Sequence, residues 1–176
     1  FVQTGPTKDR CIKAVQVKPA GNAKTVVHHA NSSFQLRQAD GSFKDADRVT
    51  EYAMGKVGEI VPDGVCRVAP ADGWVSWDIH LYPGGIGATA PNTVIEDNVV
   101  EIGLWLHPED YQYEYKQDLA LYGIDEGELV IPPHGTTMTQ GHHTFDHPVR
   151  IDSFQPHGHL RMNAASLEIF YPESGR

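Results

Sequence analysis

The stretch GWVSWDIHLYPGG, residues 73–85, alternates apolar and polar side chains with a period of two. In an extended strand, side chains two residues apart point to the same face. On the apolar face lie Val75, Trp77, Ile79 and Leu81, and on the polar face lie Ser76, Asp78, His80 and Tyr82. This pattern predicts a strand whose sheet has one face against a core.

Most of the chain divides into further short segments of this kind, bounded by glycine, proline, asparagine or aspartate. Helical periodicity is weak, and its best candidate, PEDYQYEYKQDLALYG (residues 108–123), fits a strand or a connector equally well. We therefore predict an all-β chain, a sandwich with Greek-key or jelly-roll connections. The other expected strand segments are CIKAVQVKP (11–19), KTVVHHANSSF (24–34), NVVEIGLWLHP (98–108), GELVIPPHG (127–135), HPVRIDSFQPHGHLRM (147–162) and ASLEIFYPESG (165–175).

The composition limits the classes of partner. The 176 residues carry a formal net charge of −9. This charge argues against a nucleic-acid surface, which needs clustered Lys and Arg, and against docking on anionic lipid. No apolar run is long enough to span a bilayer, and no signal peptide is recognisable. The chain opens at FVQTGPTKDR without an initiator methionine, so we expect a mature product or a fragment.

The two cysteines, Cys11 and Cys66, permit one disulfide at most. Neither lies in a CxxC or CxxCH pattern, so a thioredoxin-type redox site and c-type haem attachment have no support. Secreted compartments favour pairing, but the sequence leaves both the paired and the reduced state open.

Ten histidines are many for this length, and three groups lie on strand-like segments: His28–His29, His80, and His157 with His159. A His-x-His on a strand places two imidazoles on one face, and neutral imidazole is a common ligand of copper and zinc. Adjacent histidines on a regular strand face opposite ways. Both His28 and His29 can therefore reach one ion only at a bulge or a strand end. His80, on the polar face of its strand, is available as a third ligand.

Two or three histidines with an open position are typical of catalytic copper or zinc, and they lack the thiolates of a closed structural zinc site. The alternative is that these histidines are hydrogen-bonded polar residues of half-exposed strands. Most of the remaining histidines are expected to be exposed in turns, beside proline or glycine: His107, His134, His142, His143 and His147. The last three could form a surface metal site.

The order HH … H … HxH resembles that of the copper type II, ascorbate-dependent monooxygenases, the family of peptidylglycine alpha-hydroxylating monooxygenase. DRCIKAVQVKPAGNAKTVVHHA (9–30) is similar to the family's opening strands and its HH pair. EYAMGKVGEIVPDGVCRVAPADGWVSWDIHLYPGG (51–85) is similar to the segment that leads to its third histidine. The start of the family's second domain and its HxH resemble ELVIPPHG (128–135) and VRIDSFQPHGHLRM (149–162). The amino-acid sequence of these segments is most similar to that of bacterial relatives.

The resemblance implies two jelly-roll β-sandwich domains that are separated by a solvent-filled cleft and carry one copper each. For this chain the resemblance predicts one full domain, residues 1–118, and the start of a second domain, residues 119–176. Strands that close the second sandwich in the family have no counterpart here. We therefore expect its exposed strand edges to be covered by a missing C-terminal part or by a larger protein complex.

The resemblance also implies the roles of the histidines. His28, His29 and His80 would hold the electron-transfer copper. His157 and His159 would be two ligands of the copper at which oxygen binds and a substrate C–H bond is attacked.

Departures from the family pattern bear on activity. The family's second copper has a Met ligand far downstream of HxH, and no methionine here has that context. Met162 follows His159 by three residues, which on a strand points it to the opposite face. Asp78 stands two residues before the third histidine, where the peptide-hydroxylating enzyme carries glutamine, and the segment before HxH lacks the family's arginine. The second site is therefore expected without a Met ligand in this chain.

Two functions follow as hypotheses, and whether the chain is an enzyme stays open between them. The first is a copper-dependent monooxygenase-like protein, an oxidoreductase that hydroxylates C–H bonds of a small molecule or peptide with O₂, two separated coppers and a reductant. The second is a non-catalytic accessory subunit of a larger periplasmic or membrane-associated complex that has kept the scaffold. A cupredoxin-like carrier ranks third, because neither cysteine has a histidine nearby in the sequence. Both leading hypotheses place the chain in the periplasm or outside the cell.

Overall fold

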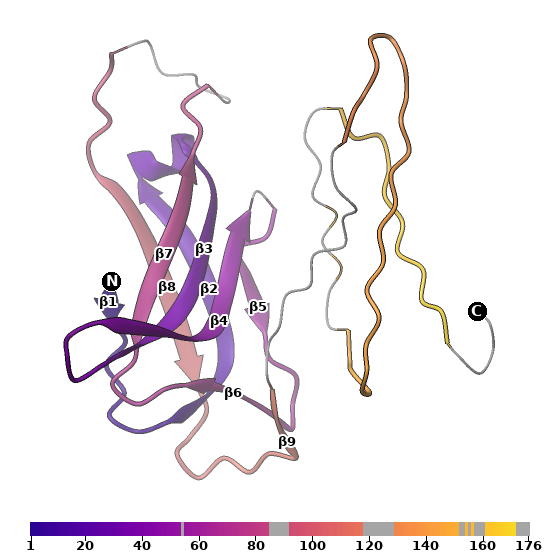
Figure 1. The fold of residues 1–176 in the computed structure, drawn as a ribbon. Helices are drawn as coiled ribbons and strands as arrows, with labels where there is room; N and C mark the ends of the chain where they lie inside the picture. Colours follow the sequence, from indigo (N-terminus) through magenta and orange to yellow (C-terminus); the bar gives the residue numbers. More distant parts are fainter. Residues whose placement is uncertain are drawn as a thin grey trace. The chain divides into compact units, whose positions relative to one another are not determined.

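The structure is a computed structural model, and it describes residues 1–53, 55–84, 92–117, 129–151, 154, 156 and 161–171. The chain divides into two compact units, Phe1–Leu121 and Tyr122–Arg176. The first unit contains all the described strands, and Figure 1 shows them as two layers.

The first sheet has β3 (Val27–Arg37) at its centre, between two antiparallel partners. The strands of this sheet lie in the order β1 (Val2–Gln3), β7 (Trp74–Leu81), β3 and β4 (Phe43–Ala53). The strand predicted from residues 73–85 is therefore β7, and its partner β3 carries the His28–His29 pair. Two of the three histidine groups thus lie on neighbouring strands of one sheet (Figure 1).

The second sheet is built around the long strand β2 (Arg10–Gly21). On one side β2 pairs along its length with β8 (Asn98–Leu106), and on the other it pairs with β6 (Val65–Ala69) and β5 (Gly58–Ile60) in succession. The short strand β9 (Tyr115–Gln117) lies parallel to β6. The segment at 108–123, for which helix, strand and connector were all left open, contributes a strand within its described part.

Helical structure in the described part of the chain is limited to the 3-10 turn η1 (Asn22–Thr25), which takes the first residues of the segment expected as a strand at 24–34. No helix among these residues is long and apolar enough to cross a bilayer.

The core lies between the two sheets and takes side chains from both. Phe34, Val49 and Val75 enter it from the first sheet, and Ile12 and Val15 enter it from the second. All five are at most 2% exposed. Trp77, predicted on the apolar face of its strand, packs against the same cluster. The predicted all-β sandwich is confirmed.

A disulfide between Cys11 and Cys66 joins β2 to β6, with Cα atoms 4.8 Å apart. It closes a long loop, since the two residues are 55 positions apart in the sequence. This resolves the pairing that the sequence left open. Because disulfides persist mainly in oxidising compartments, the bond points to an environment outside the cytosol.

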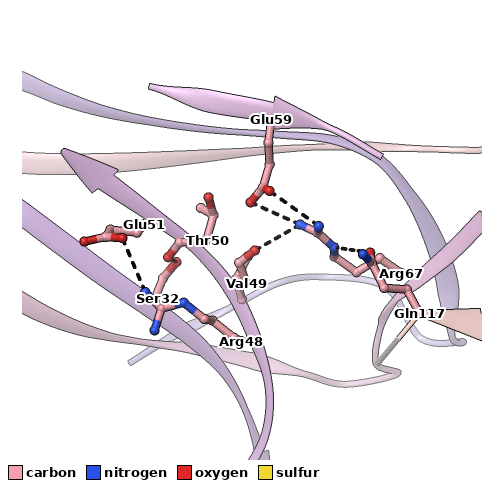
Figure 2. Close-up of polar contacts among 8 residues, drawn as sticks. All are labelled: Ser32, Arg48, Val49, Thr50, Glu51, Glu59, Arg67 and Gln117. Atoms are coloured by element: carbon pink, nitrogen blue, oxygen red, sulfur yellow. Dashed lines mark hydrogen bonds and ion pairs between the residues drawn. The ribbon is translucent and has the colours of Figure 1, made fainter. Parts of the chain in front are cut away.

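Arg67, on β6, is a buried charge inside the sandwich, with a side chain that is 5% exposed (Figure 2). Its guanidinium forms an ion pair with Glu59 at 3.1 Å and donates a hydrogen bond from Nε to the Gln117 side chain at 2.9 Å. It also donates to the carbonyl of Val49, on the first sheet, at 3.4 Å. Burying a charge is tolerated when it is paired and hydrogen-bonded in this way.

The carboxyl group of Glu59 makes this network sensitive to pH. Burial raises the pKa of Glu59, but the nearby Thr50 hydroxyl and the Arg67 guanidinium outweigh it and hold the pKa below its usual value. A carboxyl whose pKa is lower in the folded than in the unfolded state adds stability above its unfolded pKa. That stability is lost as the pH falls through the folded value.

We therefore expect the free energy of unfolding to fall on acidification below about pH 4.5, the ordinary pKa of a glutamate. Urea unfolding of the wild-type chain and of Glu59→Gln would measure it between neutral and acid pH. The stability difference between the two chains should shrink as the pH falls, because the variant has no carboxyl to protonate. A difference that stays constant with pH would contradict this role of Glu59.

The strands predicted for residues 127–175 are not formed in the described part of the second unit, which consists of turns and irregular chain. An alternating sequence gives a stable strand only when its apolar face is covered and its backbone is paired. Large apolar side chains there are exposed instead: Leu129, Val130, Ile131, Val149, Ile151, Phe154, Leu167, Ile169, Phe170 and Tyr171.

Candidate metal centre

The adjacent histidines of β3 lie at a β-bulge. Val27 pairs with Leu81 of β7, and His29 pairs with His80, so β3 advances two residues where β7 advances one. His28 is the extra residue, and at a bulge the regular alternation of side chains fails. This is the irregularity that the sequence required for both rings to reach one ion.

His80 faces both imidazoles of the pair. Its Nδ1 lies 3.0 Å from Nε2 of His29 and 3.4 Å from Nδ1 of His28. The three ring planes are steeply inclined to one another, with centroids 4.8 to 5.4 Å apart. Each ring nitrogen of a neutral imidazole has either one proton to donate or one lone pair that can accept. Nδ1 of His80 can therefore form a good hydrogen bond to one of its two neighbours, but not to both.

The spacing of these nitrogens fits a single metal ion. Two imidazole nitrogens that each bind an ion at about 2.0–2.1 Å lie roughly 3 to 4 Å from one another. The two distances at His80 fall in this range, and one ligand atom from each of the three residues lies within 4.8 Å of the others. The cluster of His28, His29 and His80 could therefore hold a metal ion.

The ligand atoms that are available limit which metals the cluster could bind. Both cysteines of the chain are in the disulfide, so no thiolate is available as a ligand. A Cys-containing blue-copper centre, the cupredoxin alternative, therefore lacks its sulfur ligand. Three imidazoles suit copper or zinc, and the half-buried pair with an exposed His80 leaves the cluster open to solvent.

Tyr82 was not singled out from the sequence, yet its ring lies 6.3 Å from that of His28. The sequence signal was present, because Tyr82 follows His80 by two residues on the polar face of the predicted strand. In the structure, the N–H of Tyr82 continues the β7–β3 pairing by donating to the carbonyl of Val26. Asp78 precedes His80 by two residues and pairs in register with Asn31 of β3. These residues extend the face of the sheet that carries the cluster.

A polar clamp holds β4 to β3 beside the cluster. Arg48 donates a hydrogen bond to the side-chain oxygen of Asn31 at 2.9 Å and forms an ion pair with Glu51 at 3.6 Å. Figure 2 shows the Arg48–Glu51 pair on β4. Since Asn31 is two residues from His29, this clamp fixes the strand that carries two of the three imidazoles.

The second predicted site, His157 and His159, lies outside the described residues. Within the described part, Met162 is exposed, and the cluster of His28, His29 and His80 is the one group of three potential ligands that converges. His142, His143 and His147 do not form such a group among the described residues.

Most of the five remaining histidines are exposed, as expected, and His107 is the exception with an exposed fraction of 7%. Its ring stacks on the ring of Tyr111 with centroids 3.7 Å apart. Its backbone N–H and carbonyl are both hydrogen-bonded. The N–H donates to the carbonyl of Cys11 at 2.8 Å, and the carbonyl accepts from Arg10 at 2.7 Å. The turn is therefore packed against the start of β2.

Comparisons of this chain with protein-family models, curated proteins and solved structures found no match.

Proposed function

We propose that the protein is a copper-dependent, monooxygenase-like oxidoreductase whose first unit binds copper through His28, His29 and His80. The observation that carries the proposal is the convergence of these imidazoles, in which His80 Nδ1 lies 3.0 and 3.4 Å from nitrogens of the other two. The order of the histidines in the sequence adds the resemblance to the copper type II monooxygenases.

Copper is the metal that the cluster and the resemblance support together. At sites with nitrogen ligands, Cu²⁺ binds more tightly than Zn²⁺. Copper would supply one-electron chemistry. The chain's own residues bind the ion, orient the rings through the β3–β7 register and leave His80 accessible from solvent.

The proposal extends to the compartment and the second site. The Cys11–Cys66 disulfide suits the periplasm or the extracellular space. His157 and His159 are proposed as ligands of a second copper, at which a small-molecule or peptide substrate would be oxidised.

The second candidate function is a non-catalytic accessory subunit of a larger complex. The number of exposed large apolar side chains in the second unit favours it, because apolar surface of this kind is often covered by a protein partner. Among them Val130, Phe170 and Tyr171 are each more than 60% exposed.

Copper reconstitution of the full chain, followed by electron paramagnetic resonance, tests the proposal. We expect tightly bound Cu(II) with hyperfine coupling to imidazole nitrogens. In a chain that carries His157→Ala and His159→Ala, so that only the first site can contribute, adding His80→Ala should strongly reduce this signal. Oxygen uptake that needs ascorbate would support the oxidoreductase. Copper binding without oxygen uptake would favour the accessory subunit, and a chain that retains no copper would exclude the copper site.

A further inference from the structure

The strand β8 is an open edge of the second sheet within the described part of the chain. It pairs with β2 from Ala14↔Trp105 to Gly21↔Asn98, and no described strand pairs with its other side. Exposed edges are usually protected by charges, prolines or bulges. β8 contains no proline and one charged residue, Glu101, and its register with β2 is regular along this span.

The side chains of β8 leave apolar surface uncovered on both faces. Ile102 and Leu104 face the core but are only partly buried. On the outer face, Val99 is 50% exposed and Trp105 is 51% exposed. An edge of nine residues with apolar side chains on both faces is a template for another strand.

The residues of β8 are symmetric about Ile102 in a way that fits a copy of the same strand. In an antiparallel pair centred on Ile102, Val99 lies opposite Trp105 and Val100 lies opposite Leu104. Directly opposite residues share a face of the sheet. The two exposed outer side chains would therefore cover each other, and the half-buried inner ones would meet across the core face.

We propose that β8 is a dimer interface, at which two copies of this chain pair antiparallel about a two-fold axis through Ile102. A two-fold axis makes each contact occur twice, so a self-complementary strand needs no second surface. The dimer would join the second sheets of two sandwiches into one continuous sheet.

The single charge of β8 and the length of the strand together favour this register over its neighbours. Centred on Ile102, the pairing places Glu101 opposite Gly103, so the two carboxylates do not face each other. A pairing centred on Glu101 would set them directly opposite, which is destabilising. A pairing centred on Gly103 would place Val99 opposite position 107, beyond the end of β8 at Leu106.

Single cysteines test the register in the full chain. Ile102→Cys should form an intermolecular disulfide under mild oxidation, because the residue faces its own copy. Leu104→Cys is the matched control: in the proposed register it faces Val100, and its own copy lies about 13 Å away along the strand. That distance is beyond the reach of a disulfide. Intact mass must show that the native Cys11–Cys66 bond is retained. Cross-linking at 104 as fast as at 102 would overturn the register.

A pair of charge variants tests the dimer without cross-linking. Gly103→Lys and Gly103→Glu both require the Trp105 ring to move, because a Cβ at 103 would lie 2.9 Å from it. They place charges of opposite sign opposite Glu101 of the other copy. We expect the lysine variant to dimerise about tenfold more tightly in sedimentation equilibrium at low salt.

The same two substitutions at Gln38, an exposed residue beyond β3, control for the change in net charge. The dimerisation affinities of Gln38→Lys and Gln38→Glu should differ much less than those of the two Gly103 variants. A wild-type chain that stays monomeric at every concentration, or equal affinities of the two Gly103 variants, would overturn the proposal.

Discussion

Replacing His80 by alanine should weaken Cu(II) binding by the first unit by at least about 100-fold, since even changes behind the ligands of a metal site cost roughly 10- to 100-fold. His80 is the ring that contacts both others, through Nδ1 at 3.0 and 3.4 Å. Its loss leaves His28 and His29 as the ligands in the cluster. Competition with a chromogenic copper chelator would measure the affinity.

The comparison is made in a background that also carries His157→Ala and His159→Ala, so that the second proposed site does not contribute. His134→Ala is the matched control, because His134 is an exposed imidazole in a turn of the second unit. It should leave the affinity unchanged. Equal affinities for the His80→Ala and His134→Ala chains would show that copper binds elsewhere.

Removing the disulfide with the pair Cys11→Ala and Cys66→Ala should lower the free energy of unfolding substantially. The bond spans 55 positions, and in the chain-entropy description the closure of a loop of that size is worth about 4 kcal/mol. The double variant avoids a lone thiol. Urea unfolding of the two chains would give the difference.

Copper affinity should be nearly unchanged in the folded double variant, because the bond lies in the second sheet and the imidazoles lie in the first. A loss of stability below about 1 kcal/mol would indicate that the unfolded chain is already compact. Loss of copper binding in a chain that is still folded would show coupling between the sheets.

Sequence periodicity predicted those elements whose faces differ in polarity. β7 alternates cleanly, and its buried residue Val75 is on the predicted face. The chemistry of adjacent histidines led to the bulge, because no regular strand lets His28 and His29 share an ion. Backbone geometry and ligand chemistry were enough for this part of the site.

Other parts depend on partners distant in the sequence. β4 reads FKDADRVTEYA, with charges in its first half and no sustained alternation. It forms a strand because β3 offers a backbone to pair with and the core takes Val49. Arg67 would be placed outside the core by its charge, yet it is buried because Glu59 and Gln117 meet it there. The segments of the second unit alternate without a described partner, and alternation alone did not make them strands.

The bulge in β3 makes the convergence of the three imidazoles depend on the number of residues in the strand as well as on their identity. Deleting His28, the extra residue of the bulge, would restore the regular pleat of β3. The ring of His29 would then be the only imidazole of the pair that remains on the strand. The loss of one residue, with the other nine histidines intact, is thus enough to remove the convergence of imidazoles at this point.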